Sequence, residues 1–193
     1  MCTSLTSKQL IILVNNFKNQ NWDKHINKTV TCLQNFHDYV FGAHNSSYTN
    51  IQTKHFRKSS HQKHCRNHAL DALAKHIENK MKGKTRNDFA DFDELYDYLR
   101  PQTKMAYIGD ITIYDAIFRL GFMMGFLPGK SVYLHRGAMD GAKKLLNVHT
   151  LNYREPITIF PKEVQSLGWL VEPFLCLNKH NFNATIQLKK RNP

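Results

Sequence analysis

The stretch from Tyr107 to Leu146 most constrains what this chain can fold into, because six of the nine glycines lie in it. Near its start, Gly109 has the freedom to take the positive φ of a tight turn. Asp110 is a residue type that caps helix N-termini. The apolar residues that follow recur at helical spacing, at Ile113, Ile117, Leu120 and Met124. The pattern predicts a turn at Gly109 and a helix after it.

The turn predicted before this helix has a chemical consequence. The first N–H groups of an α-helix have no acceptor inside the helix, and the helix dipole places partial positive charge at that end. The backbone amides around Asp110 would therefore point outward. We expect them to seat a phosphate group without the help of a side chain.

Similar patterns predict helices along most of the chain. Thr6 and Gln9 have capping-box spacing, and Asp91 and Glu94 repeat it. The expected helices cover residues 6–19, 22–41, about 61–82, 91–99, 110–124, 137–146 and 161–168, and the one β-like run is 157–160. We therefore expect a mainly α fold, a helical bundle in one domain over residues 1–178, with a basic tail at 179–193.

The charge balance favours a polyanionic partner. The 193 residues include 27 Lys and Arg against 15 Asp and Glu, which gives a net charge of +12. The most basic segment, residues 51–86, has ten Lys or Arg and only two acids. Such an excess is typical of nucleic-acid-binding proteins, and no segment has the pattern of a membrane-surface helix.

The sequence gives no sign of export or of a membrane span. The apolar run at residues 10–14 is too short for a signal peptide, and the most apolar long window, 108–127, contains three charged residues. The four cysteines, Cys2, Cys32, Cys65 and Cys176, show neither pairing nor metal-ligand spacing. We expect a cytoplasmic protein with no membrane partner and no cofactor.

Residues 105–112 lie between two predicted helices and contain the glycine turn. The region from about 91 to 125 resembles the helix-hairpin-helix element of the base-excision DNA glycosylase superfamily, which has the endonuclease III-like fold. The family pattern is an apolar residue followed by x-Gly-x-Gly-x-x-Thr-Ala. Ile108, Gly109 and Thr112 match it, and Tyr107 stands in place of the first glycine.

About twenty residues farther on, Val132–His135 stands where the family has a segment similar to Val-Asp-Thr-His. The resemblance thus covers about residues 99–146, a quarter of the chain. It implies a glycosylase-like helical scaffold that binds double-stranded DNA. Because helix-hairpin-helix elements also occur in proteins without glycosylase activity, the chemistry depends on the individual residues.

The residues that carry the family's chemistry are replaced here. An aspartate there stabilises positive charge developing on the sugar, and a lysine attacks C1′ in bifunctional members. Tyr133 and Ile111 occupy the matching positions, and neither can do this work. The resemblance therefore implies DNA binding without the usual catalysis.

Two other functions are kept as hypotheses. Asp115 or Asp140 would supply the carboxylate of an active monofunctional glycosylase. The simpler interpretations are an ion pair of Asp115 with Arg119 and a position for Asp140 in the first turn of its helix, where a carboxylate complements the dipole. The other hypothesis is a protein-interaction module whose basic face meets an acidic protein.

His135 and Arg136 follow an extended apolar triplet and precede a glycine. They either hold a phosphate or flipped base together, or His135 caps the helix start while Arg136 is solvated. With both included, the predicted DNA contacts are Tyr107, Ile108, Gly109, Asp110, Thr112, His135, Arg136, Lys54, Arg57, Lys58, Lys63 and Arg66.

His61, His64, Cys65 and His68 share one face of a predicted helix. Imidazole and thiolate groups are zinc ligands, but ligands from one helix cannot close around a tetrahedral metal alone. Basic residues lie alongside, so we interpret this face as a phosphate-contacting surface and expect no metal site.

Overall fold

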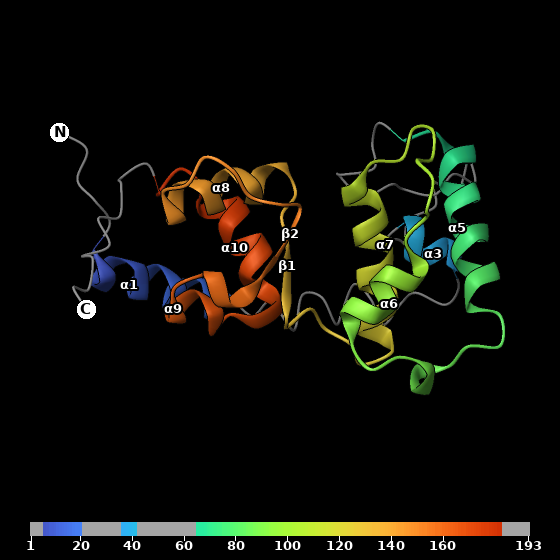
Figure 1. Ribbon diagram of the computed structural model, residues 1–193, viewed down its shortest axis with the longest axis horizontal. Coiled ribbons are helices and arrows are strands. Elements are labelled where there is room, and N and C mark those ends of the chain that lie inside the picture. The colour runs from blue at the N-terminus through green and yellow to red at the C-terminus, as the bar shows by residue number, and fades with distance from the viewer. Residues whose placement is uncertain (1–5, 21–35, 42–64, 183–193) are drawn as a thin grey trace. The chain divides into compact units, whose positions relative to one another are not determined.

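The computed structural model describes residues 6–20, 36–41 and 65–182, and this part of the chain is mainly helical (Figure 1). Its α-helices are α1 (Ser7–Lys18), α3 (Phe36–Phe41), α5 (Asn67–Met81), α6 (Phe92–Leu99), α7 (Asp110–Met123), α8 (Arg136–Leu146), α9 (Lys162–Gln165) and α10 (Val171–Asn178). Strands β1 (Ser131–Tyr133) and β2 (Arg154–Pro156) form an antiparallel pair, and short 3₁₀ helices occupy Arg86–Asp88, Ile157–Ile159 and Gly168–Leu170. The mainly α class expected from the sequence is confirmed.

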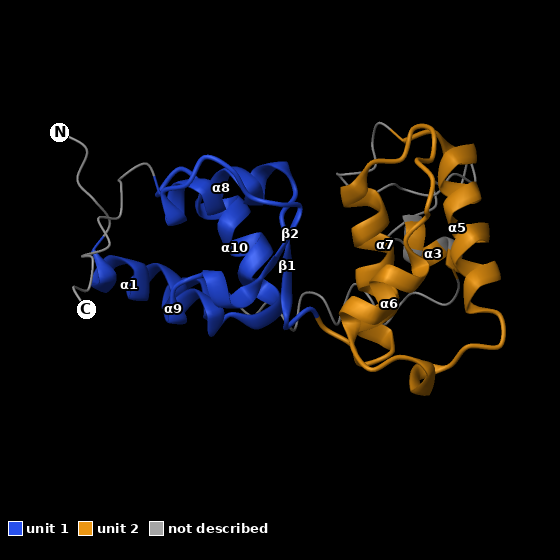
Figure 2. Ribbon diagram, in the orientation of Figure 1, with its two compact units in different colours: residues 1–21, 128–193 blue, residues 22–127 orange. Residues whose placement is uncertain are grey.

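The chain divides into two compact units, which Figure 2 separates by colour. Unit 1 comprises residues 1–21 and 128–193, and unit 2 comprises residues 22–127. The sequence predicts a single domain over residues 1–178, and this stays a prediction. Local spacing carries no record of which distant segments contact one another, so it could not indicate this division.

Unit 2 packs α3, α5, α6 and α7 around a shared core. The apolar stripe of α5 is buried at Leu70, Leu73 and Ile77, as its spacing predicts. Helix α6 buries Phe92 and Tyr96, two of its three aromatic residues, and the Phe92 ring meets the Tyr114 ring of α7 edge to face, with centroids 6.0 Å apart. Burial of this aromatic and aliphatic surface holds the turn before α7 in place.

The start of α6 follows the predicted cap. The carboxylate of Asp91 accepts a hydrogen bond from the Glu94 amide at 3.0 Å, and the Glu94 carboxylate accepts one from the Ala90 amide at 2.6 Å. The helix ends at Leu99, and Pro101 follows two residues later. Its first turn carries acidic residues, so the helix that precedes the predicted hairpin presents negative charge.

Unit 1 joins segments from both ends of the chain. Helix α1 packs with α9, where the Lys18 ammonium donates to the Ser166 hydroxyl at 2.9 Å. The Phe17 ring meets the Phe174 ring of α10 edge to face, with centroids 5.3 Å apart. The capping box of Thr6 and Gln9 is present at the start of α1, which confirms that prediction.

Helices α8 and α10 form the closest helix pair of unit 1. The small residues expected on α8 lie at this contact, with Ala138, Gly141 and Ala142 buried. A Cβ added at Gly141 would collide with the carbonyl group of Leu175. Glycine is therefore required here by the close approach of two backbones.

Several predicted boundaries change in the structure. The run 157–160 is not a strand, because Ile157–Ile159 forms a 3₁₀ turn and β1 pairs instead with Arg154–Pro156. The helix expected over 161–168 ends at Gln165. The helix expected from about 61 is described from Asn67 onward, and only Phe36–Phe41 of the predicted 22–41 helix lies within the described residues.

The predicted basic tail at 179–193 lies mostly outside the described residues. Of the four described positions, 179–182, the last is buried, since the Phe182 ring contacts Phe174 with centroids 5.8 Å apart. Within the described residues no helix is both long enough and apolar enough to cross a membrane.

Candidate nucleic-acid interface

The connection between α6 and α7, residues 100–109, has its left-handed residue at an unexpected position. Tyr107 has φ 63°, whereas Gly109 has φ −94° and ψ 163°, which is ordinary extended backbone. The expectation of a positive φ at Gly109 is therefore wrong. The Ile108 amide donates to the Met105 carbonyl at 3.3 Å, and closing this turn places the left-handed residue at Tyr107.

The cap of α7 also differs by one residue from the prediction. Gly109, not Asp110, is the N-cap, and Asp110 is the first helical residue. Gly109 has no side chain, so it makes no side-chain capping hydrogen bond. Its carbonyl accepts from the amides of Thr112 at 3.0 Å and Ile113 at 3.2 Å. The amides of Asp110 and Ile111 occupy the helical positions that lack an acceptor within the helix.

The side chains of this turn divide between buried and exposed. Ile108 and Thr112 are buried, so they anchor the turn, and only their main chains remain to contact a ligand. Gly109 and Asp110 are exposed, and Tyr107 is 56% exposed. Of the five predicted DNA contacts in this turn, two therefore have buried side chains and three are accessible to a ligand.

Charges of both signs surround the turn. A groove of about 780 Å³ runs beside it and includes Asp97, Arg100, Lys104 and Asp110 in its lining. The Arg100 guanidinium lies 3.6 Å from the Asp110 carboxylate, and both side chains are well exposed. Arg100 and Lys104 are not among the contacts predicted from the sequence. Their position between the end of α6 and the glycine turn was the signal that could have identified them.

The start of α5 lies against this turn. The Arg66 guanidinium carbon is 4.3 Å from the centroid of the Tyr107 ring, and the His68 ring meets the same ring edge to face at 6.0 Å. Beneath them, the Cys65 sulfur lies 3.5 Å from the Thr112 hydroxyl oxygen. Arg66, from the middle of the basic segment 51–86, therefore meets the glycine turn, a contact that local sequence spacing does not predict.

Several predicted contacts lie outside the described residues. These are Lys54, Arg57, Lys58 and Lys63, together with His61 and His64 of the histidine and cysteine group. Residues 6–20, 36–41 and 65–182 contain no cluster of three His, Cys, Asp or Glu placed to hold a metal ion.

His135 and Arg136 belong to unit 1, whereas the glycine turn belongs to unit 2. His135 is the N-cap of α8, but its side chain makes no capping hydrogen bond; it is buried, with its ring 5.4 Å from the Tyr153 ring. Arg136 begins the helix and is exposed. Because His135 is buried and Arg136 is exposed, the structure does not favour a phosphate pocket formed by both side chains.

Asp115 forms the helical ion pair that its spacing predicts. Its carboxylate lies 3.7 Å from the Arg119 guanidinium, and the two side chains are 19% and 12% exposed. Burial lowers the pKa of Arg119 from its ordinary value, and the charge of Asp115 opposes that shift. The guanidinium also donates to the Val40 carbonyl at 3.5 Å, so this pair joins α7 to α3.

Asp140 lies on the exposed side of α8, beyond the first turn in which it was expected, so that positional prediction is wrong. Its charge acts on the half-buried thiol of Cys176. Burial raises the pKa of this thiol, and the charges of Glu172 and Asp140 add to the increase while Lys179 opposes it. A thiol with a raised pKa is a poor nucleophile at neutral pH.

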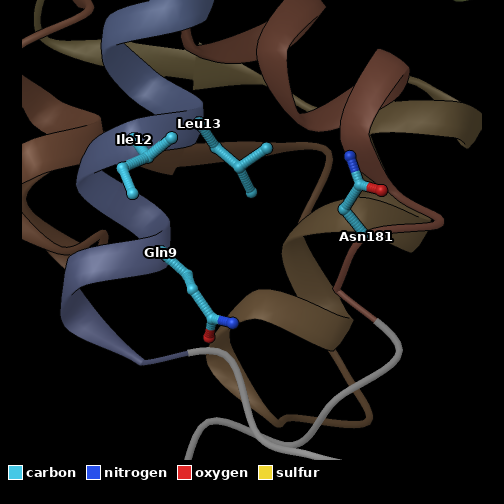
Figure 3. Close-up of a pocket in the computed structure, with 4 residues that line it drawn as sticks. All are labelled: Gln9, Ile12, Leu13 and Asn181. Atoms are coloured by element: carbon cyan, nitrogen blue, oxygen red, sulfur yellow. The ribbon is translucent and has the colours of Figure 1, made fainter.

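Unit 1 has a small hollow of about 300 Å³ lined by Gln9, Ile12 and Leu13 of α1 and by Asn181 (Figure 3). Beside Ile12, which is 57% exposed, the Ile11 side chain is also exposed. The apolar run at residues 10–14 is responsible, because five consecutive apolar residues cannot all face inward from one helix. The hollow offers no charged group for catalysis.

Comparison of the chain with protein-family models, with curated proteins and with solved structures gives no match. The resemblance to the helix-hairpin-helix glycosylases therefore rests on the sequence motifs within residues 99–146 alone.

Proposed function

We propose that unit 2 binds double-stranded DNA through the turn before α7 and the start of α5, as a helix-hairpin-helix protein of the glycosylase type that lacks the usual catalytic Lys and Asp. The scattered cysteines favour a cytoplasmic, reducing setting for this function.

One observation carries the proposal. Arg66 lies over the exposed ring of Tyr107, so the basic segment and the glycine turn form one surface. Each was predicted separately to contact nucleic acid, and the contact between Arg66 and Tyr107 brings the two together. A phosphate at the amides of Asp110 and Ile111 would have Arg66 and Lys104 within the same surface to complement its charge.

The acidic residues of the surface limit its affinity. Asp97 and Asp110 repel a phosphate, and Arg100 offsets the second of them through its ion pair. Binding therefore depends on the excess of basic residues in segment 51–86, and we expect it to weaken steeply as salt rises.

The test is fluorescence anisotropy of a labelled duplex titrated with the full chain at several salt concentrations. If about four phosphates are neutralised, affinity falls roughly a hundredfold between about 50 and 200 mM salt. An affinity that stays constant over this range would contradict the proposal.

The glycosylase alternative receives no support from its two candidate carboxylates. Asp115 is engaged with Arg119 and largely buried, and Asp140 lies exposed on α8. Formation of abasic sites on damaged duplexes by the full chain would nevertheless establish that activity and overturn the non-catalytic assignment.

A protein-interaction module is the second candidate, and the apolar face of α1 favours it. Ile11 and Ile12 are exposed there, next to the hollow of unit 1. A partner retained after nuclease treatment and lost in the Ile12→Asp variant would support this function. A partner released by nuclease would point to DNA instead.

A further inference from the structure

We propose that the Tyr107 ring is a stacking platform for an unpaired nucleobase, so that this surface prefers DNA with an unpaired nucleotide to fully paired duplex. The inference rests on the proposed function and adds the kind of DNA that the surface selects.

The first observation is the exposure of a large aromatic ring at a turn position. Tyr107 is 56% exposed and has φ 63°, a conformation that glycine or asparagine adopts more readily. The left-handed backbone carries the ring outward, while its chain neighbour Ile108 is buried. Packing of the core therefore does not account for an aromatic residue at this position.

The second observation is that neighbours from α5 orient the ring. The Arg66 guanidinium lies over it at 4.3 Å, and the His68 ring stands at 87° to it. A ring held in this way loses little conformational freedom when a base stacks on it. Aromatic rings with adjacent cationic groups are the usual contacts of unpaired bases, because every base has a π-face.

The third observation is the space beside the ring. A shallow hollow of about 470 Å³ is lined by residues 104–109, from Lys104 to Gly109, with Tyr107 among them. The Lys104 ammonium is available at its edge for the phosphate of the same nucleotide, since Lys104 is exposed.

The geometry of the ring and the hollow favours an unpaired base over a paired one. A base inside a duplex already stacks on two neighbours, so it cannot present a face to Tyr107 without being unstacked. A bulged base has already lost this stacking, and it can occupy the hollow while the flanking duplex contacts the basic surface. One aromatic stack corresponds to a preference of roughly tenfold.

The experiment compares two probes with the full chain. One is a fully paired duplex, and the other is the same duplex with a single unpaired 2-aminopurine. We expect the bulged duplex to bind roughly tenfold more tightly and the 2-aminopurine fluorescence to be quenched on binding. Equal affinity for the two probes would overturn the inference while leaving duplex binding intact, and failure to bind either probe would overturn both proposals.

Two substitutions at one position separate stacking from folding. Tyr107→Phe keeps the ring and should keep both the preference and the quenching. Tyr107→Asn removes the ring but accepts the left-handed backbone, so it should fold, and it should lose more affinity for the bulged probe than for the paired duplex. Its preference for the bulged probe should disappear, and a preference retained in Tyr107→Asn would contradict the assignment of the ring.

Discussion

The guanidinium of Arg66 lies 4.3 Å from the centre of the Tyr107 ring, and this contact links the first residues of α5 to the turn before α7. Cation–π contacts at exposed sites are worth about 0.5–1 kcal/mol, so this one stabilises the fold only slightly. Its importance for the proposed function lies in placing a positive charge beside the exposed turn.

Replacing Arg66 with alanine should weaken duplex binding and reduce the magnitude of the slope of log affinity against log salt by about one, as expected when one phosphate contact is lost. Anisotropy titrations at several salt concentrations measure both quantities. Lys8→Ala is the matched control, because Lys8 is exposed on α1 in unit 1. An unchanged slope in Arg66→Ala would remove this residue from the interface.

The contribution of a backbone amide can be isolated at Asp110. Proline is well tolerated as the first residue of a helix, and Gly109 before it already has the extended backbone that proline requires. Asp110→Pro removes the amide together with the carboxylate, whereas Asp110→Ala removes only the carboxylate. We expect Asp110→Ala to bind duplex a few-fold more tightly than the parent chain, and Asp110→Pro to bind roughly tenfold more weakly than Asp110→Ala. Equal affinities of the two variants would contradict a phosphate seat at this amide.

We expect Asp115 to stabilise the fold and to have no catalytic role. Asp115→Asn leaves the Arg119 guanidinium largely buried without its compensating charge, so the free energy of unfolding should fall by about 3 kcal/mol in urea titrations. The exposed Asp140 provides the control, and Asp140→Asn should change stability by less than about 0.5 kcal/mol. Loss of a measurable base-release activity in either folded variant would instead identify the catalytic carboxylate.

Two glycine substitutions should have opposite outcomes. Gly141→Ala forces α8 away from the Leu175 carbonyl and should cost about 1–3 kcal/mol of unfolding free energy. Gly109→Ala meets no atom within 4 Å and has φ −94°, so its stability should stay within about 0.5 kcal/mol of the parent chain. Thermal or urea unfolding of the two variants checks this, and a destabilised Gly109→Ala would mean that the glycine is needed for a reason other than space.

Asp88 gives a pH dependence with a definite sign. Its carboxylate accepts hydrogen bonds from the Thr85 amide at 2.7 Å and the Thr85 hydroxyl at 3.0 Å, and these bonds, with help from Lys84, lower its pKa. A lowered pKa in the folded state stabilises the fold above the unfolded pKa of about 3.9, and this contribution is lost as pH falls through the folded value. The difference in Tm between the parent chain and Asp88→Ala should therefore be constant from about pH 7 to 5 and shrink at lower pH. A difference that grows on acidification would contradict the assignment.

The sequence was informative where structure is decided locally. The caps at Thr6 and Asp91 depend on residues three positions apart, and both are present. The face of α8 that carries small residues could also be predicted, because Ala138, Gly141 and Ala142 recur at helical spacing. These features need no knowledge of distant partners.

Features that depend on contacts between distant segments could not be predicted from local sequence patterns. Tyr107 adopts the left-handed conformation, although the intrinsic preference of glycine pointed to Gly109. The short strand Arg154–Pro156 forms because β1 lies beside it, whereas the more apolar run after it coils into a 3₁₀ turn. The meeting of Arg66 with the glycine turn likewise depends on how α5 packs against α3 and α6, which no local pattern encodes.

The assembly of unit 1 from residues 1–21 and 128–193 has a consequence for biosynthesis. Phe17 has no access to Phe174 until translation has passed α10, so α1 must wait for most of the chain to be made. Unit 2 is encoded in one uninterrupted run and has all of its partners when Leu127 leaves the ribosome. The middle of the polypeptide can therefore reach its native form first, and the two ends close afterwards as the final step.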